Sequence, residues 1–458
     1  MIATPEYIFP RSDGTVYSKR NNVLPLSASA PEEYYPVIGE KKLQRLLDVA
    51  SRLKGIKLLE INATAQGGGV AEMLLTVIPF LNLLGIDAEW KVIKGNTDYF
   101  ECTKRMHNLL QGMDGSFTTE MEEMYLDNLE VCGNENLIDY EPDVVTVHDP
   151  QPLCLTHYIR KPREIWLWRC HIDIEEASLK DNGNLGDLIT DCVEHYDAAI
   201  FSTAHYVVSQ WLMPKFIIPP FIDPLSDKNR EISHNEINLV LNKYGIDNRV
   251  PIITHIGRFD PWKGIDRTIA TYRKVKTERM CQLVIAGGTA TDDPEGSRII
   301  AGIREDTKDD EDIHVLNLSP DSNIEINALQ RAASVIMQPS TKEGFGLVIT
   351  EALWKSKPVI AGNVGGIPLQ IRNNDTGYFY ETSQKAARKV ISLLDNPNIA
   401  LAVGNKGKEY VREHFLMPDR ITDYLLAIEA LVTGSINKKT CGECIISYHP
   451  WSKLTKRR

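Results

Sequence analysis

Short apolar runs alternate along most of the chain with longer segments whose apolar positions recur every three to four residues. A short apolar run bounded by turn residues is typical of a buried strand, and the longer pattern is typical of an amphipathic helix. Helices are predicted, for example, over 68–85, 265–278 and 325–334. The predicted strands cover 56–62, 89–93, 143–148, 164–171, 198–202 and 215–219 and, in a second series, 251–259, 282–288, 313–318, 334–340 and 357–363.

The alternation of strand and helix predicts parallel sheets with helices on both faces. Because it occurs in two series, we expect an α/β protein of two Rossmann-like, doubly wound domains over 1–222 and 235–415. A polar, turn-rich stretch at 222–239 separates the series and is expected to be the linker. The first 35 or so residues show little periodicity and are expected to form an arm, and 436–458 a loose tail.

Composition and charge narrow the class of protein. The 458 residues carry a net charge of −11, which disfavours a nucleic-acid partner. The N-terminus lacks a basic start and a long apolar core, so no secretory signal is predicted. The most apolar stretch, 74–86, contains Pro79 and Asn82 and is too short to span a bilayer. We therefore expect a cytoplasmic protein without a membrane partner; the oligomeric state stays open, a homodimer included.

The cysteines suggest neither a disulfide framework nor a metal centre. Most stand alone inside apolar segments, as buried free thiols do. Cys441 and Cys444 form one CxxC pair in the tail, and a zinc site would normally need a second pair or nearby histidines. The remaining six are Cys102, Cys132, Cys154, Cys170, Cys192 and Cys281.

Open α/β sheets bind ligands outside the carboxyl ends of their strands, so the residues after each predicted strand are the candidates. In "HIGRFDPWKGID", Arg258 and Lys263 flank a proline turn after the strand 251–259. An arginine fork and a lysine point charge together suit a diphosphate. The alternative is that both are solvated loop cations.

A second motif, "STKEGFGLVITEALWKS", follows the strand 334–340. Gly344 and Gly346 allow the loop to turn its backbone N–H groups toward a ligand. Glu343 lies at the start of this loop, and Glu351 lies about two helical turns further on. Ionised carboxylates accept hydrogen bonds from sugar hydroxyls and from a ribose diol. A helix-dipole role would explain at most one of the two glutamates, because Glu351 lies beyond the first turn.

Glycine-rich turns and polar strand ends complete the candidate set. Gly67, Gly68 and Gly69 lead directly into a helix, where an anion is favoured, and Gly365 and Gly366 form a similar turn. Either turn could also be a plain loop. Two consecutive strands in the first half end in polar residues that suggest an acceptor site, namely His148, Asp149 and Gln151 on one and His171 and Asp173 on the next.

These motifs together resemble the retaining glycosyltransferases of family 4, which have the GT-B fold. Arg258 and Lys263 followed by "EGFGLVITE" look like the donor-site signature of that family. The stretches "GGGVAEMLLTVIPFLNLLGIDAEWKVI", "HNLLQG", "VHDPQP" and "WRCHIDIE" narrow the resemblance to trehalose glycosyltransferring synthases and the related retaining trehalose phosphorylases. The resemblance covers about 37–430. It implies that the two domains face each other across a cleft and that the helix at 416–434 crosses back to the N-terminal domain.

The resemblance also implies roles for individual residues. Arg258 and Lys263 would hold the diphosphate, and Glu351 would bind the ribose. Glu343 would bind the donor glucose, and His171 would lie beside the anomeric centre and the 6-hydroxyl. Among these, His171, Glu343, Arg258 and Lys263 are the expected catalytic residues. The other expected donor-binding residues are Gly68, Gly69, Gly344, Phe345, Gly346 and Leu347, and the expected acceptor-binding residues are Asp149, Gln151, His171 and Gly69.

The implied reaction moves glucose from ADP-, UDP- or GDP-glucose to free glucose, with retention and reversibly, to form α,α-trehalose. No DxD motif follows a strand, so we expect no cofactor and no metal in the chemistry, with the two cations neutralising the leaving diphosphate. Three alternatives remain open: a trehalose phosphorylase, a related transferase with another acceptor, and a sugar-nucleotide sensor without catalysis. A phosphorylase would not need Glu351 for a ribose, which favours the synthase.

Overall fold

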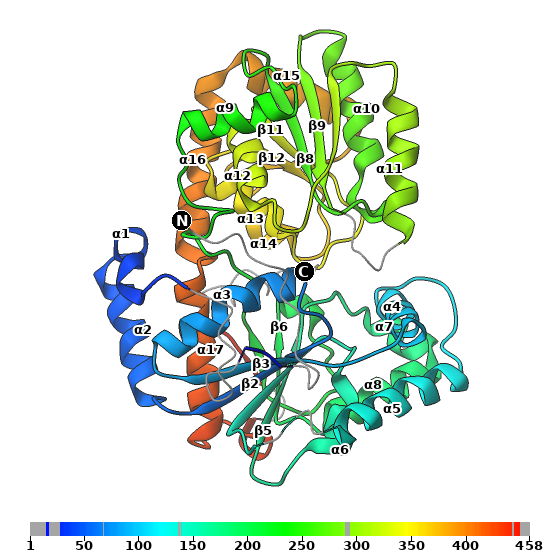
Figure 1. Cartoon of the computed structure of the whole chain (residues 1–458), viewed down its shortest axis with the longest axis vertical. Coiled ribbons are helices and arrows are strands. Elements are labelled where there is room, and N and C mark those ends of the chain that lie inside the picture. Colours follow the sequence, from blue (N-terminus) through cyan, green and yellow to red (C-terminus); the bar gives the residue numbers. More distant parts are fainter. Residues whose placement is uncertain are drawn as a thin grey trace. The chain divides into compact units, whose positions relative to one another are not determined.

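The computed structural model describes residues 15–17, 28–66, 68–135, 138, 140–288, 294–441 and 444–448, so Gly67 of the glycine-rich turn lies outside the described residues. The chain forms two compact units. Unit 1 contains Met1–Pro220 and Met417–Arg458, and unit 2 contains Phe221–Leu416 (Figure 1). Within the described ranges, no helix has both the length and the apolar character that a membrane span requires.

Unit 1 is built on an eight-stranded sheet in the order β1-β3-β2-β4-β5-β6-β7-β14. All neighbouring pairs are parallel except β1 with β3. The strands are β1 (Thr15–Tyr17), β2 (Lys57–Asn62), β3 (Asp87–Val92), β4 (Val144–His148), β5 (Ile165–Cys170), β6 (Ala198–Phe201), β7 (Lys215–Ile217) and β14 (Ile445–Ile446). The helices are α1 (Tyr35–Ile38), α2 (Glu40–Arg52), α3 (Gly69–Leu83), α4 (Thr97–Leu110), α5 (Thr119–Asn134), α6 (Thr156–Ile159), α7 (Glu176–Asp181), α8 (Gly183–Glu194), α17 (Met417–Val432) and α18 (Lys438–Cys441).

Unit 2 has a six-stranded parallel sheet in the order β10-β9-β8-β11-β12-β13. Apolar side chains of α10, α11 and α15 form the core on one face, and those of α9 and α12 form it on the other, as expected for a doubly wound domain. The strands are β8 (Ile252–Ile256), β9 (Gln282–Gly287), β10 (Ile313–Asn317), β11 (Val335–Gln338), β12 (Val359–Ala361) and β13 (Tyr378–Phe379). The helices are α9 (His234–Lys243), α10 (Ile265–Lys276), α11 (Pro294–Thr307), α12 (Asn323–Ala332), α13 (Leu347–Trp354), α14 (Ile367–Gln370), α15 (Ser383–Asp395) and α16 (Pro397–His414).

Helix α17 returns the chain to unit 1 and packs against α2. Lys42 on α2 forms an ion pair with Asp419 on α17 at 2.7 Å. Tyr424, near the middle of α17, is buried, and its hydroxyl donates a hydrogen bond to Glu60 on β2 at 2.7 Å. Residues about 360 positions apart in the sequence therefore share one core.

The expected arm and loose tail are wrong where the structure describes them. Residues 15–17 form β1 and pair with β3, and Ile445–Ile446 form β14 and pair with β7, so each end of the chain supplies an edge strand of the same sheet. Both strands are too short to show a periodicity in the sequence.

The expected linker at 222–239 is also packed. The side chain of Asn327 on α12 donates hydrogen bonds to the carbonyl groups of Asp227 and Arg230 at 2.8 and 2.9 Å. Ser233 and Glu236 form a capping box that starts α9 inside the stretch. Polar side chains suit this turn-rich segment because they can bond to backbone groups that lie outside a helix or strand. The whole segment belongs to unit 2.

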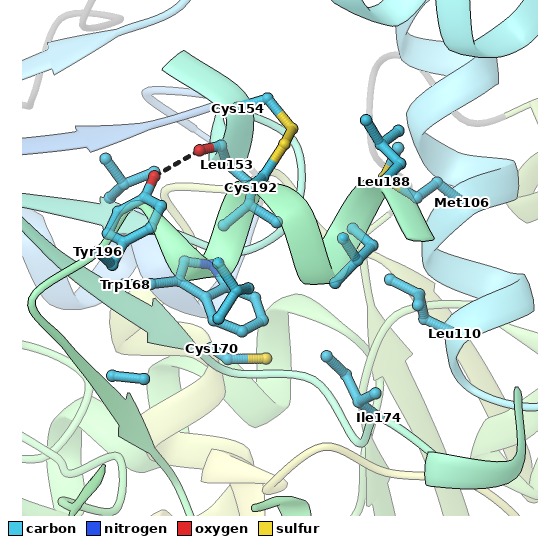
Figure 2. Packing of buried hydrophobic residues seen from close by; sticks show 14 of the residues in the cluster. Met106, Leu110, Leu153, Cys154, Trp168, Cys170, Ile174, Leu188, Cys192 and Tyr196 are labelled. Atoms are coloured by element: carbon cyan, nitrogen blue, oxygen red, sulfur yellow. Dashed lines mark hydrogen bonds between the residues drawn. A yellow bond between two sulfur atoms is a disulfide. The ribbon is translucent and has the colours of Figure 1, made fainter. Parts of the chain in front are cut away.

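The expectation that the isolated cysteines are free thiols fails at two positions. Cys154 and Cys192 form a disulfide in the core of unit 1, with their Cα atoms 5.1 Å apart (Figure 2). Cys441 and Cys444 are also joined. The free, buried cysteines of the described chain are Cys102, Cys132, Cys170 and Cys281.

Candidate functional site

Two neighbouring strand ends in unit 1 hold the predicted acceptor residues. The parallel register pairs His148 at the end of β4 with Arg169 on β5, so the loops after these strands lie side by side. The backbone N–H of His171 donates to Asp149 Oδ1 at 2.7 Å. Asp149 itself adopts a left-handed backbone with φ of 62°, and its N–H donates to the carbonyl of Arg169 at 3.0 Å. The structure thus brings His148, Asp149 and His171 together.

A chain of hydrogen bonds orders the two histidines. The Oε1 atom of Glu60 accepts a bond from the Tyr424 hydroxyl, and its Oε2 atom lies 2.6 Å from His148 Nε2. The Nδ1 atom of His148 lies 3.0 Å from His171 Nε2, and the two rings are parallel within 7°. Glu60 and Tyr424 were not among the residues predicted from the sequence.

The chain of bonds fixes which ring nitrogens carry protons. Burial lowers the pKa of His148 and, with Arg169 and His148 nearby, lowers that of His171 well below its usual value. Both rings are therefore neutral near pH 7. A carboxylate at Glu60 accepts from His148 Nε2–H, which leaves His148 Nδ1 to accept from His171 Nε2–H. The Nδ1 atom of His171 is then an acceptor, suited to a sugar hydroxyl.

Asp149 has an unusual proton affinity for a carboxylic acid. Burial raises its pKa to about 7, against the lowering effects of the His171 N–H and of Arg169. Its charge consequently changes in the physiological range, unlike that of an exposed aspartate. A perturbed acid at a strand end is a typical feature of a functional site.

The remaining predicted residues of unit 1 lie around this pair of loops or at the start of α3. The carbonyl of Gln151 accepts from the Tyr99 hydroxyl at 2.6 Å, while its buried side-chain Oε1 has no hydrogen-bond partner among the described residues. Gly69 is the first residue of α3, and Gly68 before it is extended, with open space where a Cβ would lie. The fold itself therefore does not require glycine at position 68. Asp173 follows β5 and is partly buried.

In unit 2, the structure joins the two motifs predicted for the donor. Lys263, which ends the 3₁₀ turn Pro261–Lys263, places its Nζ atom 2.8 Å from both carboxylate oxygens of Glu343. The side chains are 17% and 10% exposed, so this pair is mostly shielded from water. The hydroxyl of Ser340 donates a further bond to Glu343. Arg258 is exposed, and its guanidinium lies 3.8 Å from Asp260.

Close backbone packing holds the loops after β8 and β11 together. Gly264 has φ of +70°, and a Cβ there would lie 2.3 Å from the carbonyl oxygen of Pro339. The N–H of Thr341 donates to the carbonyl of Trp262 at 2.8 Å. Glycine is therefore required directly after Lys263, where the turn meets the loop that carries Glu343.

The loop after Glu343 is fixed on its other side by α14. Gly366 donates its N–H to the carbonyl of Gly344 at 3.1 Å, and the Gln370 side chain donates to the carbonyl of Phe345. Gly346, with φ of +85°, is the N-cap of α13, and Leu347 is its first residue. The predicted loop 343–347 is thus a rigid turn at a helix N-terminus, a position that favours an anion.

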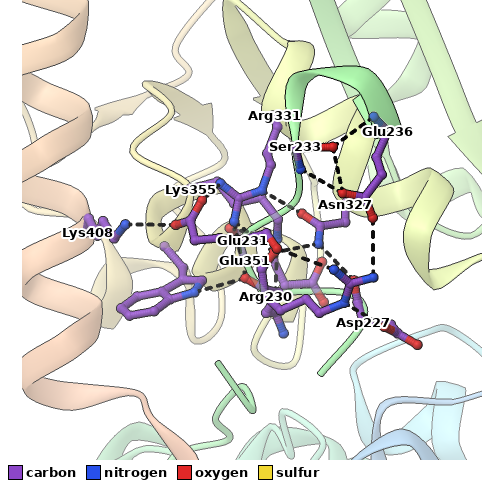
Figure 3. Close-up of polar contacts among 12 residues, drawn as sticks. Asp227, Arg230, Glu231, Ser233, Glu236, Asn327, Arg331, Glu351, Lys355 and Lys408 are labelled. Atoms are coloured by element: carbon purple, nitrogen blue, oxygen red, sulfur yellow. Dashed lines mark hydrogen bonds and ion pairs between the residues drawn. The ribbon is translucent and has the colours of Figure 1, made fainter. Parts of the chain in front are cut away.

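Glu351 lies on α13, is 1% exposed and is surrounded by partners (Figure 3). Its Oε1 is 3.2 Å from Lys228 Nζ, and its Oε2 accepts from Gln330 at 3.0 Å. Lys355 is also buried and donates to Asn229 and to the Glu351 carbonyl, and burial lowers its pKa to about 7. The sequence indicated none of these partners, because Lys228 comes from the expected linker and Gln330 from a different helix.

A further polar group at the end of β8 was also not predicted. His255 is buried, its Nδ1 lies 3.2 Å from Thr268 Oγ1, and its Nε2 has no hydrogen-bond partner in the described chain. A Cβ on Gly257 would lie 3.5 Å from Gln338 Nε2 and 3.9 Å from His255 Nε2. Burial, with the charge of Lys263, lowers the pKa of His255 to about 3, so this ring is neutral.

Comparison with known proteins identifies the family of both units. Residues 60–208 match the family described as trehalose synthase, N-terminal domain, and residues 237–410 match glycosyl transferases group 1. A trehalose synthase of Pyrococcus horikoshii is 42% identical over 406 residues, which are 87% of this chain and 96% of that protein. One of Thermococcus litoralis is 40% identical over 399 residues, 86% and 95% of the respective chains.

More distant proteins share part of this similarity. A trehalose phosphorylase of Grifola frondosa is 29% identical over 431 residues, 84% of this chain and 58% of that protein. Among solved structures, an α,α-trehalose 6-phosphate synthase of Burkholderia multivorans superposes with a TM-score of 0.64 at 14% identity, over 83% of this chain and all of that one. The fold predicted from the sequence, GT-B, is confirmed.

Proposed function

The chain belongs to the trehalose synthase family of glycosyltransferases, and from this premise we propose that it transfers glucose from a nucleoside diphosphate glucose to free glucose, with retention, to form α,α-trehalose. The observation that carries the proposal is the pairing of Lys263 with Glu343, because it joins two motifs 80 residues apart at the ligand edge of the unit 2 sheet. A cation for a diphosphate and an acceptor for sugar hydroxyls are what such a donor requires.

On the donor side, Lys263 and Arg258 neutralise the diphosphate as it leaves, assisted by the N-terminus of α13. Two unit charges about 4 Å apart interact by roughly 4 kcal/mol at an effective dielectric of about 20. Binding of the donor moves Lys263 partly from Glu343 to phosphate oxygens, which frees the carboxylate for the glucose hydroxyls. Glu351 binds the ribose while Lys228 and Gln330 keep it ionised and oriented.

On the acceptor side, the neutral His171 accepts a bond from the donor's 6-hydroxyl through Nδ1, and Asp149 with Gln151 orients the acceptor glucose. The C1–O bond to the diphosphate breaks, and the acceptor's anomeric oxygen forms the new bond on the same face of C1. A phosphate oxygen of the leaving group takes the acceptor's proton, so no covalent enzyme intermediate forms. A glucosyl adduct trapped on a side chain would contradict this mechanism.

The chemistry is proposed to need no divalent metal, since the cations of unit 2 carry the neutralising charge. Adding Mg²⁺ to protein dialysed against EDTA is then expected to leave the rate unchanged. A rate that rises with Mg²⁺ would show that Lys263 and Arg258 do not suffice.

Product analysis tests the proposed reaction directly. The protein is incubated with glucose and ADP-, UDP- or GDP-glucose, and the disaccharide is identified by digestion with trehalase and by the anomeric proton coupling. In the reverse direction, trehalose is supplied with a nucleoside diphosphate or with inorganic phosphate. Trehalose formed from a nucleotide sugar supports the synthase. Conversion of trehalose with phosphate alone identifies a phosphorylase, and nucleotide binding without turnover of any acceptor identifies a sensor.

A further inference from the structure

Two cysteine–histidine pairs in unit 1 share one spacing. Cys154 is followed three residues later by His157, and Cys192 is followed three residues later by His195. The first pair spans the 3₁₀ turn Leu153–Leu155 and the start of α6, and the second spans the end of α8. Two short repeats of cysteine and histidine brought together by the fold are typical of tetrahedral metal sites.

The structure brings the four side chains into one cluster. The sulfur atoms of Cys154 and Cys192 are bonded to each other, as Figure 2 shows. His157 Nε2 lies 3.3 Å from His195 Nδ1 and 3.5 Å from Asp191 Oδ2. Ligand atoms of His157, Asp191 and Cys192 all lie within 4.8 Å of one another. Four ligands bound tetrahedrally at ~2.0–2.3 Å lie roughly 3.3–3.8 Å apart, so these atoms would have to move closer together to hold an ion.

We propose that, once its two thiols are reduced, this cluster binds one Zn²⁺ ion through Cys154, His157, Cys192 and His195. A dithiol reductant supplies two electrons and two protons to the sulfur–sulfur bond and becomes a disulfide itself. Zn²⁺ then displaces the two thiol protons, and the neutral imidazoles complete the tetrahedron. Oxidation of the two thiolates to the disulfide by a disulfide oxidant releases the ion again.

A disulfide alone would account for the two cysteines and not for the histidines. The cysteines are fully buried, whereas His157 and His195 are exposed, and a ring nitrogen of His157 lies within 4.8 Å of the Cys192 sulfur. In the disulfide form, His195 Nδ1 also lies 2.8 Å from the carbonyl of Asp191. Binding as proposed requires the exposed His195 ring to leave this contact and to turn toward the sulfurs by a change of side-chain rotamer. Thiolates together with imidazoles select zinc over magnesium or calcium.

The site would act as a staple rather than as part of the chemistry. Cys154 lies three residues after Gln151, on the segment that continues the loop of Asp149. The ion would tie this segment to α8, next to the bond from the Tyr196 hydroxyl to the Leu153 carbonyl. It would thus hold the acceptor loop whether or not the disulfide is formed.

Metal binding by the full-length protein tests the proposal. The protein is reduced, stripped with a chelator, dialysed against zinc and analysed by mass spectrometry of the metal; in parallel, Co²⁺ is added as a spectroscopic probe. We expect one zinc per chain, a thiolate-to-cobalt charge-transfer band and the strong visible bands of tetrahedral cobalt. No zinc and no such spectrum from the reduced protein would overturn the proposal.

Variants identify the ligands. Cys192→Ser and His157→Ala are expected to abolish the bound zinc and the cobalt spectrum. The double variant Cys441→Ser/Cys444→Ser, which removes the other close cysteine pair, is expected to keep both. The reverse result would overturn the assignment.

A fold control accompanies the His157→Ala variant. After oxidation, peptide mapping should still find the Cys154–Cys192 disulfide, which shows that the fold is intact. Loss of zinc in Asp191→Asn but not in His195→Ala would overturn His195 as the fourth ligand.

Discussion

Individual residues of the acceptor loops owe their chemistry to partners elsewhere in unit 1. His171 presents Nδ1 as an acceptor because His148, Glu60 and the Tyr424 hydroxyl fix the protons one after another. Asp149 gains a raised pKa because burial disfavours its charged form more than the His171 N–H and Arg169 favour it. The two effects have opposite consequences for pH. Burial lowers the pKa of both histidines, which keeps them neutral near pH 7, whereas burial raises the pKa of the aspartate to about 7.

The pH dependence of acceptor use should therefore report Asp149. Below about pH 7 the carboxyl is protonated, and above it the carboxylate can accept hydrogen bonds from the acceptor glucose. We expect kcat/KM for glucose to fall about tenfold per pH unit below this pKa. The Asp149→Asn variant should be much less active and should lack this break. Asp173→Asn, on the neighbouring strand end, should retain it. The same break in Asp149→Asn would exclude Asp149 as its source.

The rate of transfer should depend strongly on Lys263. Replacing it by Met removes the charge that neutralises the leaving diphosphate, a loss of roughly 3–4 kcal/mol and thus about two to three powers of ten in kcat. Single-turnover measurement with a nucleoside diphosphate glucose separates this loss from weaker binding. Lys342→Met is the matched control, because that cation lies on the neighbouring loop, directly before Glu343, with its Nζ over the Trp262 ring. An equal loss in the control would mean that general charge, rather than position, governs the rate.

Secondary-structure elements place these residues through a few close approaches of the backbone. The turn that carries Lys263 meets the loop before Glu343 at Gly264, where even a Cβ atom would lie against the Pro339 carbonyl. Helix α13 is anchored through Glu351 to Lys228, which lies outside the sheet and its helices. The donor half of the site is therefore rigid because loops, and not only strands, are packed against each other.

Gly264→Ala tests this packing. A residue other than glycine in the left-handed region costs about 1 kcal/mol or more. At this position the added Cβ must also displace the Pro339 carbonyl, so we expect the free energy of unfolding to fall by about 2–3 kcal/mol. The KM for the nucleotide sugar should rise as Lys263 moves from Glu343. Urea denaturation and steady-state kinetics measure the two effects.

Gly245→Ala is the matched control for the cost of a left-handed backbone without a steric clash. Gly245 has φ of +68°, and a Cβ there would meet nothing within 4 Å. It should lose only about 1 kcal/mol of stability and leave KM unchanged. Equal losses in the two variants would show that the approach to Pro339 does not matter for the site.

The sequence predicted those parts of the fold that depend on local pattern. Each of the eleven strands expected from apolar runs overlaps a strand of the sheets, since buried parallel strands have uninterrupted apolar stretches. Strands β1, β13 and β14 were missed because strands of two or three residues at a sheet edge have no pattern to recognise. Pairings set by tertiary structure were missed for a related reason. Cys154 with Cys192 and Tyr424 with Glu60 depend on residues far apart in the chain.

The candidate site was predictable to the same extent. Asp149 and His171 directly follow strands, and Lys263 and Glu343 lie in the loops after β8 and β11. The carboxyl ends of the strands, where these residues lie, form the ligand edge of a parallel sheet. Glu60 carried a weak signal, as the one charged residue within the mostly apolar run "LLEIN". Lys228 carried none, because a lysine in a polar stretch is normally solvated. The sequence does not show the contacts that set the pKa and the orientation of each predicted side chain.

At the scale of the whole molecule, unit 1 is formed by two separate parts of the chain, and unit 2 lies between them in the sequence. The chain leaves unit 1 at Pro220, builds unit 2 and returns at Met417. The returning helix α17 buries most of its residues in unit 1 and supplies the Tyr424 hydroxyl to Glu60. The orientation of His171 thus depends on a segment that is synthesised after all of unit 2. Unit 2, by contrast, is continuous and has cores of its own on both faces of its sheet.

This arrangement predicts unequal effects of shortening the chain at two points. A protein ending at Leu416 loses α17, and with it the buried face that covers α2, so we expect unit 1 to lose its cooperative unfolding transition in calorimetry. Unit 2 should still unfold cooperatively and bind the nucleotide sugar in isothermal titration, because Lys263, Glu343 and Glu351 all lie within it. Transfer to glucose should be abolished.

A protein ending at Gly434 keeps α17 and loses only the tail with α18 and β14, and it should retain both transitions and most of the activity. If the chain ending at Leu416 still made trehalose, neither α17 nor the Tyr424–Glu60 bond would be needed for the acceptor site.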